Sequence, residues 1–191
     1  LRGTITDKSI SNKYGFISIH SSDSDLVRET NNINVFLQNI SIFNSLDCPN
    51  GALGIVNVKN IILQNIKIEK ANSYDGGAIH INFADSLIII NITIVEAKAL
   101  RGGALKISNV KSLNASDLFI NKTSAKIGAG LFLFNIEKGY FDNISIYQTQ
   151  ASEKGGAVYI WVSKIQDAGV ISKIQGEIFL QNFLAVDCSA S

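Results

Sequence analysis

One spacing dominates this chain: a polar residue recurs every 26 positions in the same local frame. In each repeat, apolar residues stand one and three positions after it, and a glycine-rich step such as Gly76-Gly77-Ala78 follows eleven or twelve positions on. The five members of this corner column are Asn39, Asn65, Asn91, Asp117 and Asn143. Self-similarity at a period of about 20–50 residues indicates stacked repeats, because one unit cannot bury its own apolar face. The 191 residues then correspond to about seven coils of one rod.

Each coil is predicted to contain three short strands separated by three corners. In residues 77–102, Ile79 and Ile81 alternate with polar neighbours, and the alternation resumes at Leu87 and again after Asn91. In-register stacking at about 4.8 Å per coil then forms uniform inward columns. These columns are Leu53, Ile79, Leu105, Leu131 and Val158, and beside it Ile55, Ile81, Ile107, Leu133 and Ile160. No segment has the helical periodicity that a βαβ fold requires. We therefore expect an all-β, right-handed parallel β-helix, with the handedness taken from the usual chirality of parallel crossovers.

The chain is expected to be one β-helix segment over residues 1–191, cut from a longer mature protein. Two stretches exceed the repeat length and are predicted insertions, 21–30 and 163–176. Although 46% of the residues are hydrophobic, no apolar run approaches the 18 or so residues of a membrane span. The net charge is +1 and the basic residues do not form a stripe, which argues against a nucleic-acid partner.

The two repeated motifs have structural explanations. A tight corner often needs a positive φ, which glycine adopts without a Cβ clash. Asparagine also tolerates the left-handed conformation, and stacked amides can hydrogen-bond from coil to coil.

The alternation of Gly-Gly-Ala-aliphatic with aromatic-x-x-Asn resembles the repeats of the polymorphic outer-membrane proteins of chlamydiae. It is also similar to repeats in large secreted proteins of protists, within the pectin-lyase-like β-helix superfamily. The matching stretches are 36–39, 140–143 and 179–182, with 77–79 and 103–105. The resemblance implies a surface-exposed adhesive or structural protein. The chain departs from the pattern at Asp117 and at Gly128-Ala129-Gly130.

Catalytic residues are not expected. Glycoside hydrolysis uses two carboxylates about 5–10 Å apart, and the outward columns contain no such pair. Those columns are Gly54, His80, Lys106, Phe132 and Tyr159, then Val56, Asn82, Ser108, Phe134 and Trp161. Asp85 and Glu137 share a corner column with Lys59 and Lys111, which we interpret as solvated charges. His20 and His80 lack neighbouring ligands, so neither a metal site nor a cofactor is expected.

The outward columns end in a two-by-two block of aromatic residues, Phe132, Phe134, Tyr159 and Trp161. That much apolar surface is rarely left in water without cause. Either the insertion 163–176 covers the block, or the block contacts a glycan or another protein. A second outward column, Phe36, Ile62, Ile88, Asn114 and Tyr140, suggests lateral contact with another domain or protomer; a one-residue slip in register is the competing explanation.

Five Asn-x-Ser/Thr sequons occur, at Asn39, Asn91, Asn114, Asn121 and Asn143. Three of them belong to the corner column, so Asn114 and Asn121 are the better candidates for N-glycosylation.

The two cysteines, Cys48 and Cys188, belong to coils about five or six apart, or roughly 24–29 Å along the axis. A disulfide needs Cα atoms within about 7 Å, so they cannot pair with each other. Each is either free or bonded to a neighbouring segment or protomer, as in a head-to-tail filament.

The sequence thus favours an extracellular or cell-surface structural or adhesive β-helix glycoprotein that contacts glycans or other protomers, with a filament subunit as one such role. The first alternative is a polysaccharide lyase or glycoside hydrolase whose site lies in the insertions or outside this segment. The second is a phage or virus tail-fibre segment, which would form trimers without glycans.

Overall fold

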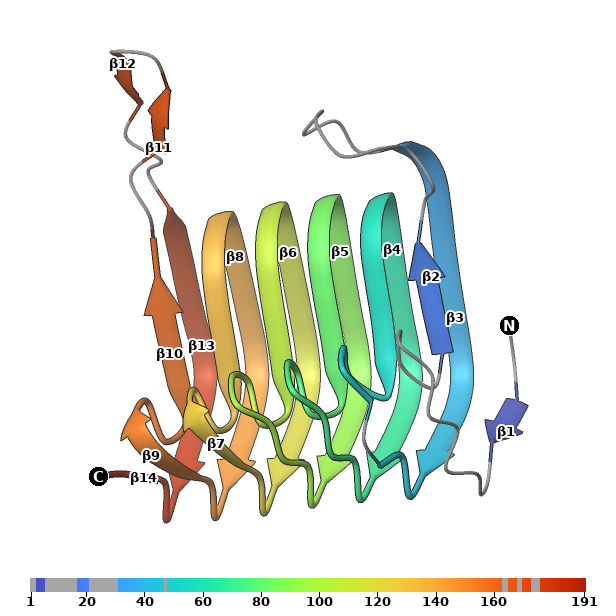
Figure 1. Ribbon diagram of the computed structural model, residues 1–191, viewed down its shortest axis with the longest axis vertical. Coiled ribbons are helices and arrows are strands. Elements are labelled where there is room, and N and C mark those ends of the chain that lie inside the picture. The colour runs from blue at the N-terminus through green and yellow to red at the C-terminus, as the bar shows by residue number, and fades with distance from the viewer. Residues whose placement is uncertain are drawn as a thin grey trace.

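The protein is a parallel β-solenoid of about five turns in the computed structural model (Figure 1). The structure describes residues 3–5, 17–20, 31–46, 48–162, 165–167, 170–172 and 176–191, and within these it contains strands but no helix. The predicted all-β solenoid with a 26-residue repeat is therefore confirmed, with about five turns in place of about seven. The insertion predicted at 21–30 lies outside the described residues.

The main sheet has nine strands, and every pairing between them is parallel. Its strands are β1 (Gly3–Ile5), β2 (Ile17–His20), β3 (Asn31–Phe43), β4 (Leu53–Glu69), β5 (Ile79–Val95), β6 (Leu105–Asn121), β8 (Leu131–Tyr147), β10 (Val158–Trp161) and β13 (Glu177–Val186). A second, parallel sheet contains β7 (Ser124–Ile127), β9 (Gln150–Lys154) and β14 (Ser189–Ala190). Within the predicted insertion 163–176, β11 (Ile165–Asp167) and β12 (Val170–Ser172) pair antiparallel and so depart from the solenoid pattern.

In each complete turn, the predicted short strands join into one bent ribbon that passes through two corners. β4, β5, β6 and β8 each run for 17 residues. Two residues of each ribbon have positive φ, for example Asn57 (60°) and Asn65 (54°) in β4. A single left-handed residue turns the chain and leaves the ladder to the neighbouring coils in place, so the ribbon continues around the corner.

The core consists of the aliphatic columns predicted from the repeat, except at their last members, where Val158 is half-buried and Ile160 is exposed. Leu53 pairs with Ile79, Ile79 with Leu105, and Leu105 with Leu131, and all four side chains are buried. Burial of one such side chain contributes about 1.5–3 kcal/mol. The core is therefore a continuous aliphatic stack along the axis of the rod.

The corner column is a hydrogen-bonded ladder. Asn65 donates from Nδ2 to Oδ1 of Asn39 at 2.9 Å, and Asn91 donates to Asn65 at 2.8 Å. Asn143 donates to Asp117 at 2.6 Å. A carboxylate only accepts hydrogen bonds, so Asp117 can accept from Asn143 but cannot continue the donation toward Asn91. All five residues have φ between 53° and 55°.

The two glycines of each Gly-Gly step serve different purposes. Gly102 has a φ of +65°, as a tight corner requires. Gly103 does not have positive φ, but a Cβ at this position would lie 2.3 Å from the carbonyl oxygen of Ala129 on the next coil. The first glycine thus allows the turn, and the second allows the backbones of adjacent coils to approach closely.

Candidate binding groove

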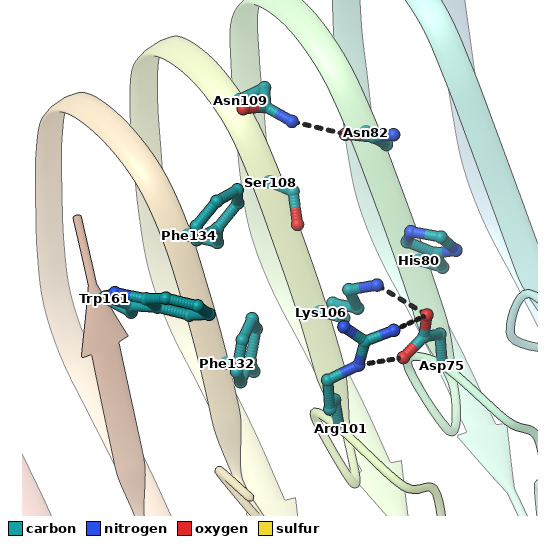
Figure 2. Close-up of a pocket in the computed structure, with 10 residues that line it drawn as sticks. All are labelled: Asp75, His80, Asn82, Arg101, Lys106, Ser108, Asn109, Phe132, Phe134 and Trp161. Carbon is teal, nitrogen blue, oxygen red and sulfur yellow. Dashed lines mark hydrogen bonds and ion pairs between the residues drawn. The ribbon is translucent and has the colours of Figure 1, made fainter. Parts of the chain in front are cut away.

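A hollow of about 340 Å³ lies on the face formed by the first residues of β5, β6, β8 and β10 (Figure 2). Strand register arranges its floor as two rows of four residues, one from each coil. The rows are His80, Lys106, Phe132 and Tyr159, then Asn82, Ser108, Phe134 and Trp161. All except Tyr159 line the hollow, together with Asp75, Arg101 and Asn109. One half of the groove is therefore aromatic and the other half polar.

The aromatic half contains the four residues that the repeat placed together. Phe132 and Tyr159 stack with ring centroids 5.7 Å apart, and Phe134 and Trp161 lie at 5.2 Å with a tilt of 58°. Phe132 is buried, with 3% of its surface exposed, whereas Trp161 is 52% exposed. The block therefore has a covered base and an open rim at Trp161. Side chains of residues 163–175, which were a predicted cover for this block, lie outside the described residues.

The polar half is organised by a buried carboxylate. Asp75 accepts hydrogen bonds from Arg101 through both of its oxygens, from Nε and Nη2 at 2.8 Å each. Its Oδ2 also accepts a bond of 2.6 Å from Nζ of Lys106. The carboxylate of Asp75 and the ammonium of Lys106 are each almost fully buried, while the guanidinium of Arg101 is more open.

Backbone pairing between coils explains this cluster. Asp75 and Arg101 occupy equivalent positions on the turns that precede β5 and β6, and they form a parallel bridge. Lys106 is the second residue of β6 and points to the same side of the sheet. The 26-residue repeat therefore places an acid directly beside a base, and the strand that follows adds a second base.

Burial lowers the pKa of Lys106 below its ordinary value of 10.5. The hydrogen bond and the negative charge of Asp75 oppose this effect, and the positive charge of Arg101 reinforces it. Loss of hydration disfavours the charged ammonium more than its partner stabilises it. Lys106 therefore retains its proton less firmly than an exposed lysine does.

Two more polar residues on the floor are buried although their column faces away from the core. Nδ1 of His80 lies 3.2 Å from Oδ1 of Asn50. Ser108 is 4% exposed, and its hydroxyl has no hydrogen-bond partner among the described residues. We expected these outward columns to face solvent. Instead, the turn that carries Asn50 lies beside His80, and Ser108 lies among the residues that line the hollow.

Sequence reasoning overlooked Asp75 and Arg101, because it treated the turns between coils as solvated polar loops. A usable signal was present: the two residues have opposite charges and stand one repeat length apart. At another corner, Lys111 and Asp85, which we interpreted as solvated charges, form an ion pair of 2.7 Å.

The second apolar column does point outward, so the competing slip in register is excluded for it. Phe36, Tyr140 and Phe179 are exposed, and Ile62 and Ile88 are half-buried. Asn114 is also exposed in this column. Lateral contact through this face stays a prediction.

The sequons differ in their surroundings. The Nδ2 atoms of Asn91 and Asn143 donate within the corner ladder, whereas Asn114 lies exposed on β6. Asn121 is half-buried, and its Oδ1 has no hydrogen-bond partner among the described residues. Asn39 accepts a hydrogen bond from Asn65.

Both cysteines are free thiols. Cys48 is buried, with its Sγ 3.3 Å from the hydroxyl of Ser45. Cys188 is half-buried near the C-terminal coil. A disulfide to another chain therefore requires less rearrangement at Cys188 than at Cys48.

Among the residues that line the groove, Asp75 carries the carboxylate, which forms ion pairs with Arg101 and Lys106. Within the part of the chain that the structure describes, no group of three His, Cys, Asp or Glu residues is arranged to hold a metal ion. Over the same residues, no helix has the length and apolar character needed to cross a membrane.

Comparison with protein-family models finds no matching family, and comparisons with curated proteins and with solved structures also find no match. The assignment of the fold as a parallel β-solenoid therefore comes from the structure alone. The resemblance to chlamydial and protist surface repeats stays an expectation.

Proposed function

We propose that this chain is a structural or adhesive β-solenoid of the cell surface or extracellular space that binds glycans through its groove. The observation that carries the proposal is the half-exposed indole of Trp161 beside Phe134, at the rim of a hollow with polar side chains on its other half. Aromatic faces pack well on the apolar faces of sugar rings, and nearby polar groups can bond the hydroxyls. A rigid stack of parallel strands holds both halves in place.

Surface location is proposed from the repeat resemblance and from the five sequons. The likeness to the polymorphic outer-membrane proteins and to the protist repeats supports an adhesive role, and further coils or protomers are its proposed partners. The exposed apolar column that contains Phe36, Tyr140 and Phe179 supports lateral assembly, including assembly into a filament.

The test is binding to an array of neutral and acidic oligosaccharides by the purified protein. Trp161→Ala is expected to weaken binding at least about tenfold, because stacking area at the rim is lost. Phe179→Ala is the matched control, since this exposed aromatic residue lies on the other face and should leave binding unchanged. Absence of binding to every glycan, or equal loss in both variants, would refute the proposal.

A polysaccharide-cleaving enzyme is the second candidate. The observation in its favour is the buried Lys106 with its lowered pKa, since a lysine that loses its proton readily can act as a base. Against it, Lys106 is bonded to Asp75, and no second carboxylate lines the groove over the described residues. Pectin, alginate and chitin oligosaccharides should remain intact after incubation. Release of shorter or unsaturated products would favour the enzyme.

A further inference from the structure

We propose that the groove selects sugars that carry an anionic substituent, a carboxylate or a sulfate, with the ring on the aromatic half and the anion on the polar half. This inference rests on the proposed function, since it concerns the same groove. It adds the chemical class of the ligand and assigns recognition of the charge to Lys106, Arg101 and Ser108.

The charge balance of the polar half favours an anion. Asp75 neutralises only one of the two cations that bond it, which leaves one formal positive charge from Lys106 and Arg101. Two of the five N–H groups of Arg101 and one of the three of Lys106 are used on Asp75. Donors therefore remain for a ligand, and a cationic ligand would be repelled. Because these groups are largely buried, water screens their charge less than at an open surface.

Ser108 is an independent sign that a ligand belongs here. Its hydroxyl is buried and has no hydrogen-bond partner among the described residues, which is unusual, since buried polar groups are generally satisfied. In Figure 2 the hydroxyl points into the groove between Phe134 and Lys106. An oxygen of a bound anion would accept a hydrogen bond from it.

Strand register sets the distance between the two halves. Ser108 pairs with Phe134 and Lys106 pairs with Phe132, so each polar residue is one coil, about 4.8 Å, from an aromatic residue in its own row. One sugar ring on Phe134 and Trp161 therefore places a substituent beside Ser108 and Lys106. A charged group at that position meets an ammonium and a hydroxyl at the same time.

The experiment compares tetrasaccharides that differ only at carbon 6: galactose, galactose 6-sulfate, galacturonate and galacturonate methyl ester. Affinity is measured by calorimetry, with binders found on the array added as matched charged and neutral pairs. Wild type should bind at least one charged form about tenfold more tightly than its neutral partner, because a charge-assisted hydrogen bond contributes that much. The sulfate and carboxylate arms distinguish the two sources of charge.

Lys106→Met should reduce this preference to within about twofold, and Ser108→Ala should reduce it in part. Lys138→Met removes an equal charge from an exposed position on another face and should preserve the preference. Equal affinity of wild type for charged and neutral forms would overturn this inference while the proposed function survives. An undiminished preference for the charged form in a folded Lys106→Met protein would also overturn it, and absence of all binding would overturn both.

Discussion

Arg101 donates two hydrogen bonds of 2.8 Å to the carboxylate of Asp75 in the preceding coil, and the two residues occupy equivalent positions in successive repeats. Lys106 adds a third bond to the same carboxylate. One carboxylate therefore holds two cations at the base of the groove. We therefore expect substitution of Asp75 to lower the free energy of unfolding more than substitution of Lys106 does.

Asp75→Asn should destabilise the protein by about 3 kcal/mol, because it leaves the buried ammonium of Lys106 without a counter-charge. Lys106→Met should cost less than about 1 kcal/mol, since Asp75 keeps its two bonds to Arg101 and an apolar chain fills the space. Urea unfolding of both variants measures the two values. A larger loss in Lys106→Met than in Asp75→Asn would contradict this account.

The lowered pKa of Lys106 predicts a specific dependence of stability on pH. Between that lowered pKa and 10.5, the unfolded chain binds more protons at this residue than the folded chain does. The contribution of Lys106 to stability is therefore unfavourable below its folded pKa, and the penalty is relieved as the pH rises toward 10.5. Burial is the largest influence on this pKa, Asp75 and Arg101 are the charged groups that modify it, and His80 is the neighbour of Lys106 in the preceding coil.

The difference in unfolding free energy between wild type and Lys106→Met isolates this residue. It should shift in favour of wild type as unfolding is measured at increasing pH from neutral to 10.5. Lys138→Met, which removes an exposed lysine, is the comparison for the loss of one positive charge. A shift in the opposite direction would mean that the ion pair outweighs burial.

Asn65 donates a hydrogen bond to Asn39 and accepts one from Asn91. Two substitutions at this position should therefore lower the free energy of unfolding by different amounts. Asn65→Ala should lose about 2 kcal/mol, because it removes these bonds and leaves an alanine in the left-handed region. Asn65→Gly should lose about 1 kcal/mol less, since glycine adopts that conformation without strain. Thermal or urea unfolding measures both variants, and equal losses would show that the corner carries no conformational strain.

N-glycosylation is expected at Asn114 and not at Asn91 or Asn143 when the chain is expressed through a eukaryotic secretory route. A glycan replaces a hydrogen of the side-chain amide nitrogen and needs room beside it, and the amide nitrogens of Asn91 and Asn143 already donate to the neighbouring coil in the ladder. Asn114 is exposed on β6. Glycopeptide mass spectrometry of the folded, secreted protein measures occupancy at each site. Full occupancy of Asn91 in that material would contradict the structural role of the ladder.

Much of the fold was readable from the repeat. The aliphatic columns and the asparagine corners follow from a 26-residue period, because in-register stacking converts sequence spacing directly into contact. Phe132 and Tyr159, 27 positions apart, pair through their equivalent places after the glycine step. In the glycine step, the sequence predicts the role of only the first of the two glycines. A positive φ at Gly102 was foreseeable, whereas the need for a bare Cα at Gly103 arises from the carbonyl of the next coil.

The polar half of the groove was not readable in the same way. Lys106 and Ser108 stand in outward columns, and alternation alone predicts that such residues face water. Whether a turn packs against them depends on its path in three dimensions, and no periodicity encodes that path. Among the described residues the hydroxyl of Ser108 also has no hydrogen-bond partner, and this follows from its surroundings and not from its position in the repeat.

The sequence by itself determined that this protein is a stack of parallel β coils and which side chains share a column, because the repeat length sets the register. Only the tertiary structure decided which outward residues are enclosed, since the path of each turn decides which side chain it meets, as Asp75 meets Lys106. The burial of Lys106 and Ser108 makes a row of outward residues part of a candidate binding groove.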